Sequence, residues 1–351
     1  MNSENHHTVN KEPWFAVNLS YFFAGIGQLY AGRIVRGTVL ILLLLTLAAS
    51  GIWQIFAPSG NIIYGAGFLI ASAILYIWNL FDAYEFTRRG NHPTFEQQRK
   101  KDQDPWLAVF LTQIAPGAGH LYLRENIQGF IFLFIFITLY AFQGIYIAMG
   151  VISVAVSAAA AIHVYFKAPV RRALSLRPLI ILIAVMIVYG TGSRMIPFYL
   201  KSNVIRNFTT SSNDMAPVIY RGERFFVHQE QPENYQRGDV LVFELPGDTT
   251  WIYLRRLIAF AGESVEITAD SSVLVNDTPL LIDGKSITTT PEGQYALPGE
   301  PYVVPKGQFF LLAEQPVESK DSRYFGGIRN ENIIGHAYKI YWPLNRAGPV
   351  K

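Results

Sequence analysis

Long apolar stretches before residue 200 constrain the fold of this chain more than any other feature. Each is close to the roughly 20 residues that a helix needs to cross a bilayer. They cover residues 37–58, 62–82, 127–147, 149–166 and 178–200. Beyond them the apolar residues come in short runs separated by polar turns. The sequence therefore predicts a multi-pass α-helical membrane region followed by a water-exposed domain.

Composition supports a membrane protein and excludes several kinds of site. Half of the 351 residues are hydrophobic, 16% are charged, and the mean hydropathy is +0.21, which is too apolar for an ordinary soluble protein. The net charge of +3 is small, and the basic residues gather in short loops, so we expect no nucleic-acid partner. The chain has no cysteine, which excludes disulfides, thiol nucleophiles and thiolate metal sites. The polar tail 1–12 lacks the basic start of a cleaved signal peptide, so the internal segments must direct membrane insertion.

Two segments that lie 92 residues apart predict an internal repeat. The segments 13-PWFAVNLSYFFAGIGQLYAGRIVRG-37 and 105-PWLAVFLTQIAPGAGHLYLRENIQG-129 are identical at ten of 25 positions. Two apolar stretches follow each segment, which predicts repeats over 13–104 and 105–177 and a last span over 178–200. The segments resemble small two-helix membrane modules of the TM2 type. Their glycines favour close helix packing, because small residues let backbones approach; a binding role stays open.

Basic loops predict the orientation in the membrane. They carry Arg88, Arg89, Arg99, Lys100 and Lys101 in 83–104, and Lys167, Arg171, Arg172 and Arg177 in 167–177. The positive-inside rule places both loops in the cytoplasm, with an even number of crossings between them. We therefore expect 105–123, and by the repeat 13–33, to be interfacial or re-entrant. Five crossings then put residues 201–351 outside, whereas seven would leave one basic loop outside.

The histidines give no sign of a metal site. His120 and His163 lie in or beside membrane segments without a carboxylate at ligand spacing, which favours packing or hydrogen bonding. His228 and His336 stand alone in the second half of the chain, so we interpret them as structural. The sequence predicts neither a metal nor a cofactor.

Short β-type runs follow residue 200. They cover 224–229, 239–245, 251–260, 263–267, 273–276, 308–314 and 337–343. Turn signals such as Arg237-Gly238-Asp239 separate them, and helix-period segments are lacking. Residues 201–351 are therefore expected to form an all-β domain.

Four motifs in this half carry a family resemblance. They are Ser212-Asn213-Asp214-Met215-Ala216-Pro217, 237-RGDVLVFELP-246, 253-YLRRLIAFAGES-264 and Ser319-Lys320-Asp321-Ser322-Arg323-Tyr324-Phe325-Gly326. In order and spacing they resemble S-x-S-M-x-P, R-G-D, Y-I-K-R…G-x-x-G-D and S-x-D-S-R-x-x-G of the type I signal peptidase family, the serine–lysine membrane peptidases of group S26. The resemblance covers about 195–345. Two departures are a glutamate for the last aspartate of the third motif and 313-AEQP-316 in place of G-D-N-R.

The resemblance implies a site built around a serine and a lysine. In the family the serine before Met-x-Pro attacks the scissile carbonyl, and a desolvated lysine removes its proton. The implied substrate is an exported preprotein. Its signal-peptide segment would bind in an extended conformation and pair with a strand of the protein. The family roles fall on Ser212 for the oxyanion hole, Ser319 and Asp321 for orienting the lysine, Arg323 as the partner of that aspartate, and Met215 and Pro217 for binding substrate.

Both members of the dyad are replaced in this chain. Asp214 stands at the nucleophile position and Arg255 at the position of the base. A guanidinium is not deprotonated in a protein, so it cannot act as a general base. A carboxylate that attacked an amide would give a mixed anhydride with no gain. If the family geometry holds, the two residues form a charge-assisted ion pair, which predicts a site kept for structure or binding after losing its chemistry.

Three functions follow from these observations. The first is an inactive or impaired signal peptidase relative in the cytoplasmic (inner) membrane, with 201–351 outside. It would bind, present or chaperone exported polypeptides, or regulate an active peptidase or another secretion component. The second is an active signal peptidase with an altered dyad, or with a relocated site in which, for example, Asp214 is the base for Ser212. The third is a structural protein that acts through its repeated modules in the lipid bilayer.

Overall fold

The computed structural model describes residues 10–143, 146–169, 176–203, 205–245, 248–316 and 319–350. Residues 1–9, Arg171, Arg172 and Pro246, on which parts of the sequence predictions rest, lie outside these ranges. The chain divides into two compact units. One comprises Met1–Ile52 with Ala66–Phe198, and the other comprises Trp53–Gly65 with Tyr199–Lys351.

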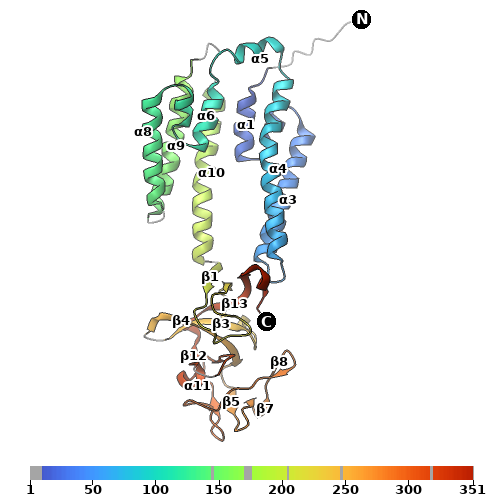
Figure 1. Ribbon diagram of the computed structural model, residues 1–351, viewed down its shortest axis with the longest axis vertical. Coiled ribbons are helices and arrows are strands. Elements are labelled where there is room, and N and C mark those ends of the chain that lie inside the picture. The colour runs from blue at the N-terminus through green and yellow to red at the C-terminus, as the bar shows by residue number, and fades with distance from the viewer. Residues whose placement is uncertain are drawn as a thin grey trace. The chain divides into compact units, whose positions relative to one another are not determined.

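The first unit is built of helices (Figure 1). They are α1 (Pro13–Phe22), α2 (Ile26–Tyr30), α3 (Ile34–Phe56), α4 (Ile62–Arg89), α5 (Pro93–Arg99), α6 (Pro105–Ile114), α7 (Ala118–Tyr122), α8 (Asn126–Phe142), α9 (Ile147–Lys167) and α10 (Leu176–Asn203). Among the described residues, four segments are long and apolar enough to cross a membrane: Ile34–Phe56, Ile62–Arg89, Ala148–Lys167 and Leu176–Ile196. The helical membrane region is thus confirmed.

The helix found where a span was expected over 127–147 is shorter than predicted. It corresponds to α8, which is apolar but has 17 residues, about 25 Å at 1.5 Å per residue. The helix ends at Phe142, and Gln143 is its C-cap residue. Residues 144 and 145 of this expected span lie outside the described ranges.

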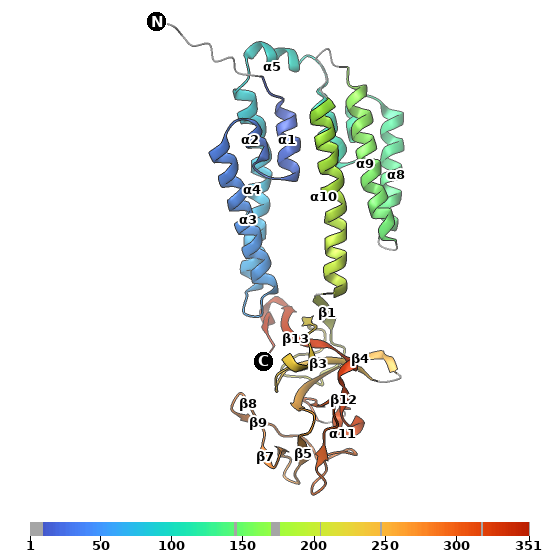
Figure 2. The same cartoon turned by 180° about the vertical axis from the view of Figure 1, so that it is seen from behind.

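Glycine turns join the short helices of the two Gly-x-Gly segments. Gly25 has φ 90° before α2, and Gly117 has φ 104° before α7, a backbone conformation that favours glycine. Each short helix packs back against the helix before it, and Figure 2 shows α2 beside α1. A Cβ added to Gly27 would lie 2.3 Å from the Ala16 carbonyl oxygen, and one added to Gly119 would lie 2.0 Å from that of Ala108. These contacts agree with the packing interpretation of the glycines.

We expect Gly27→Ala to destabilise the helical unit by about 1–3 kcal/mol, the usual cost of overpacking. The new methyl group would clash with the backbone of α1 and with the Ser20 hydroxyl, which accepts a hydrogen bond from the Gly27 N–H at 3.0 Å. Thermal unfolding of the purified protein in detergent measures the effect. Gly67→Ala in α4 is the matched control, since nothing lies within 4 Å of its added Cβ. Equal melting temperatures for the two variants would contradict the packing role.

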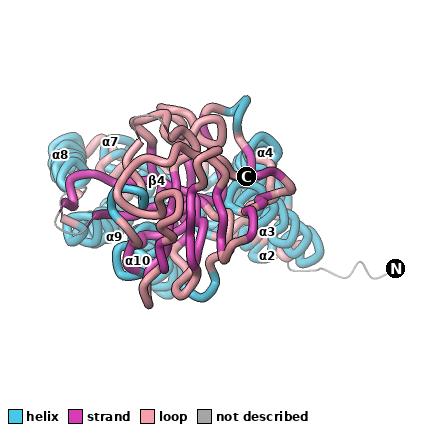
Figure 3. The backbone as a smooth tube through the Cα atoms, turned by 90° about the horizontal axis from the view of Figure 1, so that it is seen from below, coloured by secondary structure: helices cyan, strands magenta, loops and turns pink. Residues whose placement is uncertain are grey.

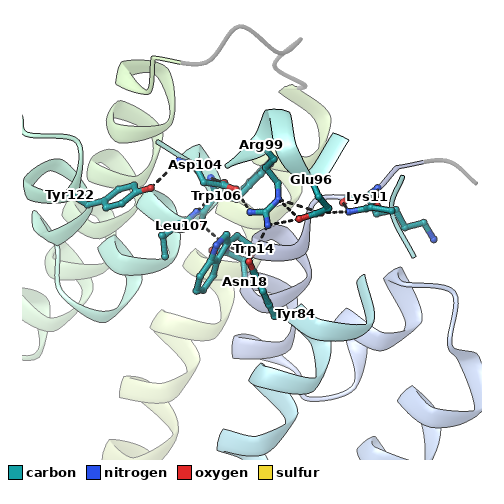
Figure 4. A network of polar contacts seen from close by, with 11 residues as sticks. Lys11, Trp14, Asn18, Tyr84, Glu96, Arg99, Asp104, Trp106, Leu107 and Tyr122 are labelled. Carbon is teal, nitrogen blue, oxygen red and sulfur yellow. Dashed lines mark hydrogen bonds and ion pairs between the residues drawn. The ribbon is translucent and has the colours of Figure 1, made fainter. Parts of the chain in front are cut away.

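A buried polar network joins α4, α5 and α6 (Figure 4). Arg99, counted above among the basic loop residues, is only 4% exposed. Its guanidinium pairs with Glu96 at 2.8 Å and Asp104 at 2.9 Å, and it donates to the Tyr84 hydroxyl at 3.0 Å. Asp104 in turn caps α6 by accepting from the Trp106 N–H at 2.9 Å. Arg99 therefore fixes the connection between helices as well as carrying charge.

The second unit consists of antiparallel sheets, whose strands are magenta in Figure 3. The main sheet has the order β1-β2-β13-β3-β4-β11-β12, with β14 paired to β13, and a smaller sheet has the order β10-β5-β6-β7. The bounds are β1 (Ile205–Thr209), β2 (Arg224–His228), β3 (Val240–Leu245), β4 (Asp248–Ala259), β5 (Ser264–Ile267), β6 (Val273–Val275), β7 (Thr278–Pro279), β8 (Leu281–Ile282), β9 (Lys285–Ser286), β10 (Tyr302–Val303), β11 (Gln308–Leu312), β12 (Ile328–Arg329), β13 (Ile333–Trp342) and β14 (Gly348–Pro349). Each β-type run of the sequence forms a strand, so the β-domain prediction is confirmed. A short α-helix, α11 (Ser322–Phe325), is added, together with short 3₁₀ helices at Pro232–Asn234, Asn330–Asn332 and Leu344–Arg346.

Strand β3 lies in the middle of this sheet and carries apolar side chains on both faces. Val240 and Val242 belong to one core cluster, and Leu241 and Phe243 belong to another, as the alternation of side chains along a strand requires. Leu241 pairs with Arg255 of β4. The buried sheet thus holds an arginine beside its central strand.

Candidate functional site

The connection between β1 and β2 places Asp214 at the site. Met215 and Ile219, which are 2% and 0% exposed, anchor this connection in the same core cluster as Leu254. Gln315 fixes it from the other side. The Gln315 N–H donates to the Asp214 carbonyl at 2.9 Å, and its side-chain amide donates to the Ala216 carbonyl at 3.0 Å. The backbone around Asp214 is therefore held at several points.

Asp214 and Arg255 form an ion pair, as predicted. The Arg255 Nη2 lies 2.8 Å from the Asp214 Oδ2. Arg255 is 2% exposed, whereas 31% of the Asp214 side chain is exposed. The guanidinium also donates to the Lys320 carbonyl, from Nη2 at 2.7 Å and from Nε at 3.0 Å, and Nη1 donates to the Leu254 carbonyl at 2.6 Å. Every nitrogen of the guanidinium has an acceptor.

The Arg255 guanidinium cannot accept a proton at neutral pH. Burial lowers the pKa of the Arg255 guanidinium, and the nearby Asp214 carboxylate opposes that shift. The pKa of an arginine side chain starts far above neutrality, so the group keeps its proton at neutral pH. The Tyr253 ring, with its centroid 5.8 Å from the guanidinium carbon, adds a cation–π contact. Arg255 can bind an anion or a carbonyl oxygen, but it cannot act as a general base.

A cavity of about 320 Å³ lies beside the ion pair. Its lining includes Ser212, Asp214 and Arg255, together with apolar side chains from β1 and β4 such as Phe208 and Trp251. Ser212 is half-buried, and its carbonyl accepts from the Thr210 hydroxyl at 3.1 Å. Among the described residues no hydrogen bond joins the Ser212 hydroxyl to Asp214. The cavity has room for a peptide side chain and offers it polar groups and an apolar wall.

Asp321 and Arg323 form a second ion pair, which is completely buried. The Arg323 Nε lies 2.9 Å from the Asp321 Oδ1, and the Asp321 Oδ2 accepts from the Ala313 N–H at 3.0 Å. Arg323 also donates to the Pro316 carbonyl at 3.0 Å and to the Ser319 carbonyl at 3.4 Å. This pair fixes the backbone at Lys320, whose carbonyl receives Arg255. Through that carbonyl the structure connects Ser319, Asp321 and Arg323 to the site.

Three residues at which the sequence departs from the family motifs also stabilise the site and the strands around it. Glu314 and Gln315 stand where the sequence departs from the family motif; Glu314 pairs with Arg256 of β4, and Gln315 holds the Asp214 connection. Glu263, the glutamate in place of aspartate, pairs with Arg237 at 2.6 Å. The departures in the sequence mark these positions, but their partners lie far away along the chain.

The structure also places the other candidate residues. Met215 lies in the core and Pro217 is exposed, and their roles in substrate binding stay predictions. His228 and His336 face each other across β2 and β13. Both approach Glu230 Oε1, at 3.2 Å and 3.4 Å, a convergence that the sequence did not indicate.

The two membrane histidines meet. His120 Nε2 and His163 Nδ1 lie 2.8 Å apart, so the hydrogen-bonding interpretation is confirmed. Within the described ranges, no group of three or more histidine, cysteine, aspartate or glutamate side chains could hold a metal ion.

Comparison with known proteins gives matches to one family. The sequence model described as "Signal peptidase, peptidase S26" matches residues 176–342. A signal peptidase I of Leptolyngbya laminosa is 30% identical over 149 residues, covering 39% of this chain and 68% of that protein. A signal peptidase I of Bacillus amyloliquefaciens is 32% identical over 155 residues, covering 39% and 74%. Signal peptidase I T of Bacillus subtilis is 29% identical over 182 residues, covering 46% and 88%.

Proposed function

Since this chain belongs to the type I signal peptidase family, we propose that it is a membrane-bound member that binds signal-peptide segments of exported preproteins without cleaving them. The Asp214–Arg255 ion pair carries this proposal. It occupies the two positions where the family resemblance calls for a serine and a lysine. A carboxylate already held by a guanidinium at 2.8 Å is a poor nucleophile toward an amide.

Peptide binding does not require the dyad. Phe208 and Thr209 of β1 line the cavity beside Asp214, and β1 stands at one end of the strand order of the main sheet. An extended peptide can add to such a strand through main-chain hydrogen bonds and can place alternate side chains in a neighbouring pocket. Such a protein could present or chaperone its client, or regulate an active peptidase.

The membrane arrangement is part of the same proposal. We propose an internal repeat over 13–104 and 105–177, a last span over 178–200, and residues 201–351 outside the cytoplasmic (inner) membrane. The matching glycine turns and close helix contacts of the two segments support the repeat. Helix α8 is short for a crossing, but a bilayer adapts to a short helix by thinning locally at modest cost.

Cleavage and binding assays on one preparation test this function. The purified protein in detergent is incubated with a preprotein that bears a small-x-small cleavage site, beside an active signal peptidase I as positive control. We expect no cleavage by the protein or by Asp214→Ala, and saturable binding of a labelled signal peptide by the protein, measured by fluorescence anisotropy. Cleavage that Asp214→Ala abolishes would instead establish an active peptidase with an altered site. Neither cleavage nor binding would favour a structural role for the membrane modules.

A further inference from the structure

Arg194 is a charged residue within an apolar candidate membrane span, Leu176–Ile196 of α10. Ionisable residues in such spans are costly and usually serve a function. Among the described residues, no carboxylate forms an ion pair with it. A guanidinium has five N–H donors, and here two of them reach acceptors, the Gly190 carbonyl at 2.9 Å and the Ser153 hydroxyl at 3.1 Å. The buried Nε has no acceptor among the described residues, so the hydrogen-bonding capacity of this cation is not filled there.

Arg194 lines a cavity of about 220 Å³ within the helical unit. The cavity lies among residues of α1, α6, α8, α9 and α10. Its polar lining is made of Tyr21, Gln113, Ser157, Tyr189, Ser193 and Arg194. This set contains a cation and several hydroxyl donors but no acidic side chain, which suits an anion that carries several oxygen atoms.

Gln113 is a second residue of the same cavity with a buried polar atom that lacks a hydrogen-bond partner among the described residues. Its Nε2 donates to the Asn18 Oδ1 at 2.6 Å, whereas its buried Oε1 has no donor in the part of the chain that the structure describes. A ligand that satisfied both Arg194 and Gln113 would combine anionic oxygens with a hydroxyl group. A head group made of a phosphate and a polyol has both.

The surroundings favour an amphiphile over a free anion. Phe22, Phe136, Val154 and Met186 form the apolar part of the cavity wall. Phe22 also lines a second cavity of about 520 Å³, whose other walls are mainly apolar and include Ile41, Leu44 and Leu69. An acyl chain can occupy apolar space of this kind while its head group remains at Arg194.

We propose that the Arg194 cavity binds an anionic phospholipid whose head group carries free hydroxyls. The phosphate accepts from Arg194 and the tyrosine hydroxyls, and a head-group hydroxyl donates to the Gln113 Oε1. This site is independent of the Asp214–Arg255 site and of its proposed function.

Native mass spectrometry of the full chain in detergent tests the proposal. The protein is offered equal amounts of phosphatidylglycerol and phosphatidylcholine. We expect it to retain phosphatidylglycerol with about tenfold preference, the scale of a hydrogen bond to a charged group. Arg194→Gln is expected to remove that preference. Arg89→Gln, which removes an exposed cation at the end of α4, is the matched control and is expected to keep it.

Further variants keep the outcome decisive. Arg194→Lys keeps the charge and covers the case that Arg194→Gln fails to fold; it is expected to retain a reduced preference. Gln113→Leu is expected to abolish discrimination between phosphatidylglycerol and phosphatidylmethanol, which lacks head-group hydroxyls. The lipid assignment is overturned if the protein shows no preference, if Arg89→Gln loses the lipid as Arg194→Gln does, or if millimolar inorganic phosphate alone displaces it.

Discussion

Combining Asp214→Ser with Arg255→Lys is expected to create cleavage of preproteins at small-x-small sites. The two substitutions supply what the family chemistry needs, a hydroxyl nucleophile and an amine that can lose its proton. The side chains at these positions already reach each other, since the present contact is 2.8 Å. We expect the parent to show no cleavage, so the gain is from background to a measurable rate.

The environment of position 255 suits a lysine base. Arg255 is 2% exposed, and burial lowers its pKa; the same desolvation would lower the pKa of a lysine toward neutrality. The Lys320 carbonyl, which now accepts from Nε and Nη2, would orient the amine. Ser212 at the cavity would stabilise the oxyanion, so adding Ser212→Ala to the double variant is expected to lower the rate about 10²-fold.

The single substitutions are the controls for this experiment. Asp214→Ser alone leaves a permanently protonated guanidinium in place of a base, and Arg255→Lys alone leaves a carboxylate that holds the amine as an ion pair. Neither is expected to cleave. A folded double variant that binds the signal peptide as the parent does, yet fails to cleave it, would show that the remaining site cannot support the family chemistry.

Asp321→Ala is expected to be the most destabilising single change in the sheet unit, at about 3–5 kcal/mol. Asp321 and Arg323 are both 0% exposed, so the substitution leaves a buried cation without its counter-charge. It also removes the acceptor of the Ala313 N–H. Thermal unfolding of the full chain in detergent, followed by tryptophan fluorescence, should show a fall of roughly 6–20 °C.

Glu331→Ala provides the matched control. It removes an ion pair with Arg329 in which 72% and 64% of the two side chains are exposed. Such a pair contributes less than about 1 kcal/mol, so we expect little change in melting temperature. Similar losses from Asp321→Ala and Glu331→Ala would contradict the structural importance of the buried pair.

The sequence by itself determined the classes of structure in this chain. Side-chain periodicity and the length of an apolar run are local properties, so the β-type runs between 224 and 343 and the spans at α3, α4, α9 and α10 could be read directly. The motif order also indicated that Asp214 and Arg255 would meet, although 41 residues separate them. That contact was predicted from a resemblance rather than from the spacing.

Only the tertiary structure decided which groups satisfy one another. Several contacts join residues from separate strands and loops. Gln315 hydrogen-bonds to the connection that carries Asp214, Arg255 donates to the Lys320 carbonyl, and two histidines approach Glu230. Arg194 and Gln113 likewise come from helices far apart along the chain. No local pattern encodes such pairings, because they depend on strand register and on which side chains packing leaves without partners. Local spacing therefore determined the elements, while packing across long sequence separations determined the chemistry of the cavities at Asp214 and at Arg194.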